Sequence, residues 1–391
     1  MNLIPSIVAR RADLIAWRRQ LHARPELGFE EVETAAFVAE RLRASGIVVH
    51  TGIAQTGVVG VIEGRPGVRS IGLRADMDAL PIDEAGDRPW RSIIPGRFHG
   101  CGHDGHTVML LAAAEHLAAT RDFDGRVVVI FQPAEEGLGG GRAMVEAGLF
   151  ERFPCDEIYA LHNMPLLPFG QAAVRPGPAL ASFDRFAVTI RGVGGHAAMP
   201  HKTVDPGLAM AHAVVALQAL VARNIDPLQA AVLSVTQMNV GVTHNVIAGE
   251  AHFAGTVRAL DETVRTTIET GFARTVRHVA QAFGADAEIV YVREYPVLVN
   301  DADASRQAAA AIVNTLGHDG LAATFPPLMA AEDFAFMLQH RPGAYLLVGQ
   351  GVAPSSPMVH QPEYDFNDDI LPIGASLLCR LAAPRHDQGS G

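Results

Sequence analysis

The sequence predicts an α/β protein in which a mixed, largely parallel sheet is flanked by helices and a smaller α+β domain is inserted. Apolar strands alternate with helices over residues 47–161 and again over residues 302–381, which is the pattern of an α/β sheet. Between these parts, residues 182–294 follow the order strand, helix, strand, strand, helix, strand, which is typical of the ferredoxin-like fold. We therefore expect one domain from residues 1–181 and 295–391, interrupted by the insertion.

The individual elements follow from apolar spacing and from helix-breaking residues. In the first domain, we expect helices at residues 13–24, 30–45 and 107–119 and strands at residues 47–50, 58–62, 70–74, 126–131 and 157–161. In the insertion, we expect strands at residues 185–191, 230–238, 250–259 and 287–293 and helices at residues 206–222 and 262–283. After it come helices at residues 302–316, 331–338 and 373–381 and a strand at residues 344–348. Asp104 is the expected N-cap of its helix.

Composition argues against several classes of function. The net charge is −11 and no basic run is long, so we expect no nucleic-acid partner. No apolar run approaches the roughly 20 residues that span a bilayer, and the N-terminus lacks a basic segment followed by an apolar core. Three cysteines are too few for a disulfide framework, which favours a reducing compartment. The sequence therefore predicts a cytoplasmic protein with no membrane partner.

One stretch, residues 98–106 (FHGCGHDGH), combines a thiol with three imidazoles. Only Gly102 separates Cys101 from His103, so both side chains reach one point if the backbone is extended. Thiolate sulfur and imidazole nitrogen suit borderline-soft divalent metals such as zinc. A single cysteine in a loop is often inert, so this stretch alone leaves metal ligation open.

Acidic residues follow two strands of the predicted sheet. Asp76 and Asp78 come directly after one apolar strand, and Glu135 and Glu136 come shortly after another. Sheets of this kind keep their chemistry at the carboxyl ends of strands. The aspartates could equally be solvated turn residues, but two glutamates against a buried strand are unusual. Because adjacent side chains point in different directions, one glutamate can bind a metal while the other faces a water.

Two more histidines lie beside strand ends. His162 follows the strand at residues 157–161, and His360 lies beyond the strand at residues 344–348. A lone histidine at a strand end is more often a hydrogen-bonded core residue than a ligand. Here, however, His162 is at the fourth successive strand end that carries Asp, Glu, His or Cys, and this regularity favours a site.

Together these side chains predict a site for two metal ions. The ligand types are Cys101, His103, Glu136, His162 and His360, with Asp78 and Glu135 beside them. Five ligands exceed one tetrahedral zinc, but they suit two metals if one ligand bridges. Glu135 would take a proton from a metal-bound water, and Asp78 would orient a ligand imidazole. The predicted reaction is hydrolysis of an amide or ester.

Seven ordered motifs resemble the metallo-aminoacylase branch of the dizinc-carboxypeptidase-type peptidase family, which includes hippurate hydrolase and the auxin-conjugate amidohydrolases. They are residues 22–30 (HARPELGFE), 74–81 (RADMDALP), 101–106 (CGHDGH), 132–137 (QPAEEG), 194–198 (GGHAA), 331–334 (AEDF) and 360–366 (HQPEYDF). The resemblance covers nearly the whole chain. It implies the same five ligands, with zinc, manganese, cobalt or nickel as the two divalent ions, and Glu135 as the general base.

The resemblance also implies roles for the insertion and for the substrate. The inserted domain would be a lid and a homodimerisation module. His196 would help to stabilise the oxyanion, in its own site or in the partner's. Asn245 and Arg258 stand where family members contact the substrate carboxylate. The implied substrate is a small N-acyl or N-aroyl amino acid, which is cleaved to a carboxylate and a free amino acid.

Some positions depart from the family pattern and leave the substrate preference open. Ala248 stands where relatives commonly have proline, and Gly100 stands where they have alanine. A dipeptidase or an N-acetyl-diaminopimelate deacetylase would share every metal ligand. A non-catalytic binding protein that kept the fold would have no use for Glu135. The roles of His99 and His106 stay open.

Overall fold

A computed structural model describes residues 1–322, 324–351 and 356–383, which divide into two compact units. Unit 1 comprises Met1–Gly177, Val299–Pro326 and the residues from Asp333 onward. Unit 2 comprises Pro178–Leu298 together with a short piece, Pro327–Glu332. Unit 2 is therefore an insertion into unit 1 that also takes up a second, later segment of the chain.

Unit 1 is built around a seven-stranded mixed sheet of order β1-β2-β4-β3-β5-β15-β6. Its strands are β1 (Val48–Ile53), β2 (Gly57–Glu63), β3 (Arg65–Asp76), β4 (Asp124–Gln132), β5 (Glu157–Pro168), β6 (Ala172–Ala173) and β15 (Gly343–Gly351). The four central strands, β4, β3, β5 and β15, run parallel, whereas the outer pairs are antiparallel. The predicted mixed sheet with a parallel centre is confirmed.

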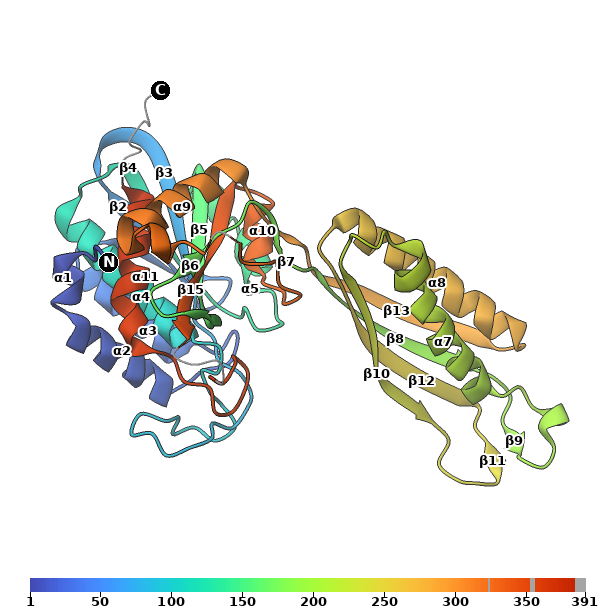
Figure 1. The fold of residues 1–391 in the computed structure, drawn as a ribbon. Helices are drawn as coiled ribbons and strands as arrows, with labels where there is room; N and C mark the ends of the chain where they lie inside the picture. The colour runs from blue at the N-terminus through green and yellow to red at the C-terminus, as the bar shows by residue number, and fades with distance from the viewer. Residues whose placement is uncertain (323, 352–355, 384–391) are drawn as a thin grey trace. The chain divides into compact units, whose positions relative to one another are not determined.

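Helices lie on both sides of this sheet (Figure 1). They are α1 (Pro5–Val8), α2 (Arg11–Ala23), α3 (Val32–Ala44), α4 (His103–Thr120), α5 (Gly140–Glu146), α6 (Leu149–Arg152), α9 (Ala302–Leu316), α10 (Phe334–Leu338) and α11 (Leu371–Ala382), with the short 3₁₀ helices η2 (His318–Gly320) and η3 (Asp368–Ile370). Helix α4 is apolar around almost its whole circumference and is buried along most of its length, as expected for a central helix.

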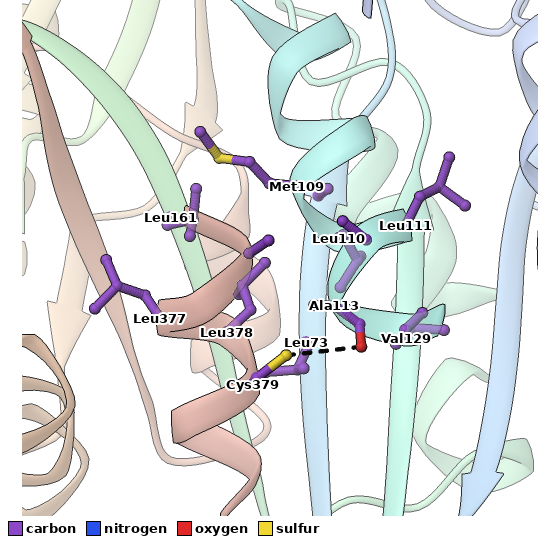
Figure 2. Packing of buried hydrophobic residues seen from close by; sticks show 14 of the residues in the cluster. Leu73, Met109, Leu110, Leu111, Ala113, Val129, Leu161, Leu377, Leu378 and Cys379 are labelled. Atoms are coloured by element: carbon purple, nitrogen blue, oxygen red, sulfur yellow. Dashed lines mark hydrogen bonds between the residues drawn. The ribbon is translucent and has the colours of Figure 1, made fainter. Parts of the chain in front are cut away.

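The core of unit 1 packs α4 against α11 and the sheet. Figure 2 shows Leu110 and Ala113 of α4 beside Leu378 and Cys379 of α11, with Leu73 of β3 close to them. The Cys379 thiol donates to the Ala113 carbonyl at 3.7 Å, and burial raises the pKa of this thiol, which keeps it protonated. This packing fixes the helix whose first turn belongs to the site.

Helix α4 begins earlier than predicted, and Asp104 is not its N-cap. The helix starts at His103, and the N-cap is Gly102 with a φ of 93°. Asp104 lies within the first turn, where its buried carboxylate is 2.9 Å from the Nε atom of the fully buried Arg18. An acidic residue ahead of an apolar run predicts a cap. The Asp104 carboxylate instead forms an ion pair with Arg18 of α2.

Unit 2 is a four-stranded antiparallel sheet of order β10-β12-β8-β13, with α7 and α8 on one face (Figure 1). Its elements are β8 (Phe183–Arg191), β9 (Gly195–His196), η1 (Pro200–Lys202), α7 (Pro206–Asn224), β10 (Ala231–Val240), β11 (Val246–Ile247), β12 (Glu250–Ala259), α8 (Glu262–Ala282) and β13 (Asp286–Tyr295). Strands β7 (Gly177–Leu180) and β14 (Leu298–Asn300) lie where the chain passes between the units. The element order and the sheet order are those of the ferredoxin-like arrangement.

Helix α7 is apolar in composition, but only one of its faces is buried. By length and composition it could cross a membrane, unlike the other helices of the described residues. Its buried residues, including Met210, Leu217 and Leu220, pack into the core of unit 2, as in a soluble core helix. Its opposite face exposes Leu208 and Val215. The length test alone is therefore weak evidence for a membrane span.

Candidate active site

Parallel strands bring distant parts of unit 1 to one edge of the sheet. The pairing of β3 with β5 ends at Arg74 and Ala160, so that His162 lies beyond it, level with the end of β3. His162 is inside β5 rather than at its end, because β5 continues through Pro168 beside β15. Strand β4 ends at Gln132 and leads into the loop that carries the two glutamates.

Five of the predicted side chains form two groups of three that share Cys101. One group is Cys101, His103 and His162, and the other is Cys101, Glu136 and His360. Within each group the candidate ligand atoms lie within 4.8 Å of one another. The Cys101 Sγ atom is 3.3 Å from His162 Nε2, and His360 Nε2 is 3.2 Å from Glu136 Oε1. If each group held one ion, the Cys101 thiol would be the ligand that both ions have in common.

Hydrogen bonds on the far side of two imidazoles aim their other nitrogen into the site. His103 Nδ1 donates to Asp78 Oδ1 at 3.2 Å, and His162 Nδ1 donates to the Asn163 carbonyl at 2.6 Å. When the two rings are neutral, these bonds leave each Nε2 atom as an acceptor. The Nε2 atom of His103 is buried and has no hydrogen-bond partner in the described part of the chain, which a metal ion would explain.

The electrostatics of Cys101 also fit a cation. Burial raises the pKa of its thiol, and the negative charge of Glu136 raises it further. The thiolate is therefore disfavoured unless a positive ion compensates its charge. A thiolate, imidazoles and a carboxylate are the donor set of zinc and its neighbours in the first transition row. The residues present fit two divalent ions.

Asp78 and Glu135 lie next to these groups. Asp78 is buried, and its Oδ2 atom accepts the backbone N–H of Glu136 at 2.9 Å. The ligand atoms of Glu135, Glu136 and His103 lie within 4.8 Å of one another. Glu135 is almost fully buried, and its Oε1 atom accepts the backbone N–H of Asp333 at 3.4 Å. Glu135 is thus close enough to exchange a proton with a water held at the ligand groups.

Beneath the site runs a buried polar network that the sequence reasoning did not assign. His106 Nδ1 is 2.6 Å from Asp76 Oδ1, and Arg74 donates to the other oxygen of Asp76 at 2.7 Å. On its other side, His106 Nε2 lies 2.6 Å from the side-chain oxygen of Asn163. Arg74 and Asp76 sit two apart on β3, so that alternation along a strand places both on one face. The two-residue spacing of Arg74 and Asp76 was the signal in the sequence for this network. The network supports the segments that carry the candidate ligands.

His99 is the remaining imidazole of the Cys–His stretch. It is fully buried, and burial lowers its pKa to about 4. Its ring lies 6.3 Å from the ring of His22, whose Nδ1 atom is 2.8 Å from Asp104 Oδ2. His99 therefore belongs to the packing under the site and does not join either ligand group.

Three residues of unit 2 are expected to contact the substrate carboxylate or the oxyanion, and two of them lie together. His196 of β9 is exposed and pairs with Val246 of β11. The Ala197 N–H donates to the Asn245 carbonyl at 3.0 Å, which holds Asn245 beside His196. Both residues are exposed at this two-stranded ribbon, where polar side chains are free to meet a ligand.

Arg258 lies far from that ribbon. It pairs with Val232 near the opposite end of β12, and its guanidinium stacks 4.2 Å from the centre of the Phe183 ring. Arg258 lies eight positions along the extended strand from Glu250, which is at the β11 end, and this corresponds to about 27 Å. Asn245 and Arg258 of one subunit therefore cannot both hold the same carboxylate of a small substrate.

Comparison with known proteins decides the family. The model of peptidase family M20/M25/M40 matches residues 72–383, which is most of the chain. The chain belongs to this family. The match includes all five candidate ligands, both glutamates of the β4 loop and the whole of unit 2.

Relatives of this M20 protein include proteins named as hydrolases. It is 39% identical over 382 residues to a hippurate hydrolase of Campylobacter jejuni, covering 98% of this chain and 99% of that protein. It is 38% identical over 396 residues to an IAA-amino acid hydrolase of Arabidopsis thaliana, covering 98% and 89% of the two chains. A solved dinuclear metal-binding M20 peptidase from Bacillus subtilis superimposes with a TM-score of 0.84 at 32% identity, covering 96% and 97%.

Proposed function

We propose that this M20 protein is a metal-dependent amidohydrolase that cleaves N-acyl or N-aroyl amino acids to a carboxylate and a free amino acid. The observation that carries the proposal is the pair of three-residue ligand groups that share Cys101 and lie against Glu135. A purely ligand-binding protein would need neither a thiol shared by two ligand groups nor a buried carboxylate beside them. The names of the hippurate and IAA-amino acid hydrolase relatives support the substrate class.

Two divalent ions would be held by Cys101, His103, Glu136, His162 and His360. Zinc fits the thiolate and imidazole donors best, and manganese, cobalt and nickel are the alternatives. When bound, such ions polarise the amide carbonyl and lower the pKa of a water at the site to near neutral pH. The dinuclear metal site named for the Bacillus subtilis structure supports two ions rather than one.

In this proposal, Glu135 moves the proton. Its carboxylate takes a proton from the attacking water as the water oxygen bonds to the acyl carbon, and it delivers that proton to the amide nitrogen as the C–N bond breaks. The nitrogen leaves as a free amine, and the acyl product is a carboxylic acid that releases its own proton to solvent and becomes a carboxylate. Asp78 holds His103 in the required tautomer and anchors the Glu136 backbone. His196 would donate to the oxyanion that forms on the carbonyl oxygen.

The spread of the residues in unit 2 favours a shared site. Because Asn245 and Arg258 of one subunit are too far apart for one small carboxylate, we propose that a homodimer supplies them from two subunits. His196 lies beside Asn245 and would come from the same subunit as Asn245. Unit 2 would then be both the lid and the dimerisation module, while the cytoplasmic location stays a prediction.

A substrate panel tests the proposal. Purified protein loaded separately with zinc, manganese, cobalt or nickel is incubated with hippurate, acetyl-amino acids, indole-acetyl conjugates and dipeptides, and the released amino acid is measured. The proposal predicts turnover of at least one N-acyl or N-aroyl amino acid and a loss of turnover with a chelator. Preferential cleavage of dipeptides or of N-acetyl-diaminopimelate would favour the rival enzymes, and no hydrolysis at all would favour a binding protein.

Subunit mixing tests the shared site. Glu135→Gln subunits and His196→Ala subunits, each inactive alone, are exchanged in one solution, and exchange is verified with tagged subunits. A partner-supplied His196 predicts recovery of part of the activity, because some sites combine an intact Glu135 with an intact His196. Verified exchange without any recovery would place His196 in the site of its own subunit.

A further inference from the structure

Glu31 is a buried carboxylate that the proposed reaction does not use. It directly precedes α3, and its side chain has no exposed surface. Its Oε1 atom accepts the backbone N–H of Ala134 at 2.8 Å, and its Oε2 atom accepts the hydroxyl of Thr56 from the turn between β1 and β2. One side chain thereby ties the start of α3 and the β1–β2 turn to the loop that follows β4.

Ala134 is the residue in that loop that most needs support. Its φ is 55°, a left-handed conformation that raises the energy of a non-glycine residue by about 1–2 kcal/mol. Its carbonyl accepts the Gly140 N–H at 2.9 Å, so both of its backbone groups are held. Gly28 packs directly beneath it, since an added Cβ there would lie 3.0 Å from the Ala134 Cα atom. The chain thus reverses at a strained residue within a closely packed frame.

The two residues after Ala134 are the proposed base and a proposed ligand. Glu135 and Glu136 leave the reversal in different directions, and the direction of each depends on the Ala134 peptide. Asp78 fixes the Glu136 N–H from the other side. Glu31 and Asp78 therefore hold the loop at two points on either side of Glu135.

We propose that Glu31 is a positioning residue, whose hydrogen bond to Ala134 holds the left-handed turn that aims Glu135 and Glu136 into the site. The kinetic consequence rests on the proposed function, whereas the geometric consequence does not. According to this proposal, the acceptor oxygen of residue 31 must reach the Ala134 N–H, but it does not need to carry a negative charge. A neutral amide oxygen at the same distance accepts the same N–H, while a carboxylate on a shorter side chain does not reach it.

Two substitutions separate reach from charge. Glu31→Gln keeps the acceptor oxygen and loses the charge, so kcat should stay within about threefold of the wild type. Glu31→Asp keeps the charge and withdraws the acceptor, so kcat should fall about 10- to 100-fold, with a much smaller change in KM and unchanged metal content. If Glu31→Asp does not fold, Glu31→Met, which keeps the length and lacks the acceptor, takes its place with the same expectation.

Glu26→Asp is the matched control. Glu26 lies on the same segment, and its carboxylate accepts the N–H groups of Glu33 and Thr34 at the start of α3 instead of a group of the loop after β4. Its shortening should leave kcat within about twofold of the wild type. A fall as large as that of Glu31→Asp would overturn the proposal, because any loosening of the segment would then suffice.

A spectroscopic readout keeps the test independent of turnover. The visible absorption of the cobalt(II)-loaded protein reports the ligand geometry to which Glu136 contributes. The spectrum should change in Glu31→Asp and match the wild type in Glu31→Gln. The proposal is overturned if Glu31→Asp has wild-type kcat and spectrum, or if Glu31→Gln is the more damaged variant. If the wild type turns over no amide, the proposed function has failed, and the spectra alone decide the role of Glu31.

Discussion

The carboxylate of Asp78 accepts the backbone N–H of Glu136 at 2.9 Å while its other oxygen faces Nδ1 of His103. One side chain therefore orients two proposed ligands that are 33 residues apart in the sequence (136 − 103 = 33). Asp78→Ala should lower metal affinity or activity about 10- to 100-fold, because both ligands lose their outer support. Competition with a chromophoric chelator measures the affinity. Asp83→Ala, which changes an exposed aspartate of the next loop, should leave it unaltered.

Cys101 is the residue that the two ligand groups have in common. Cys101→Ala should therefore reduce the metal content at both positions, as measured by elemental analysis after dialysis. Cys155→Ala removes another buried thiol of unit 1, outside the ligand groups, and should leave the metal content unchanged. Equal metal content in the wild type and in Cys101→Ala would remove Cys101 from the ligand set.

Gly102 allows Cys101 and His103 to face the same site. Its φ is 93°, and a Cβ atom there would lie 2.4 Å from the side-chain oxygen of Asn163. Gly102→Ala should lower the free energy of unfolding by about 2–5 kcal/mol through backbone strain and overpacking. Gly46→Ala is the control, because Gly46 also has a positive φ but has open space around it, and it should lose only about 1–2 kcal/mol. Urea unfolding measures both, and equal losses would show that the contact with Asn163 is unimportant.

Much of the fold, and the grouping of the candidate ligand side chains, was predictable because both depend on local pattern. Strand periodicity located the parallel strands, and the position of acidic and sulfur-bearing residues after them predicted which side chains would meet. The wrong predictions concern residues whose structure depends on contacts between distant segments. Asp104 resembles a cap in sequence, and only the packing of α2 on α4 brings Arg18 to it. His162 resembles a strand end because the pairing of β5 with β15 cannot be read from β5 alone.

The residues that support the site were harder to predict than the candidate ligands. Glu31 lies in a segment that looks like an ordinary helix start, and its partner Ala134 is 103 residues away. Arg74 and Asp76 were visible as a charged pair at a strand end, but their connection to His106 depends on how α4 packs against β3. Composition and spacing identify the groups that carry chemistry, whereas tertiary packing selects the groups that hold them.

Glu31 also predicts how stability depends on pH. Burial raises its pKa from 4.5 to about 7, an effect that the nearby Asp78 charge adds to and the hydrogen bond from Thr56 opposes. Between these values the folded protein holds a proton that the unfolded chain has lost, so this group lowers stability as pH rises from about 4.5 to about 7. Its contribution is at most about 1.4 kcal/mol per pH unit.

Glu31→Gln should remove that contribution. The stability of the variant relative to the wild type should therefore improve progressively from pH 5 to pH 7 and then level off. Chemical unfolding of both proteins at intervals of half a pH unit measures the difference. Parallel stability curves across this range would contradict a raised pKa for Glu31 in the folded protein.

The central claim is that Glu135 moves the proton in a metal-dependent amide hydrolysis. Glu135→Gln keeps the size of the side chain and removes its basicity, and its turnover should be measured together with its metal content on whichever N-acyl amino acid the wild type cleaves best. We predict wild-type metal content and a fall in kcat of about 100- to 10,000-fold. A variant that retains both its metal and most of its turnover would contradict the account.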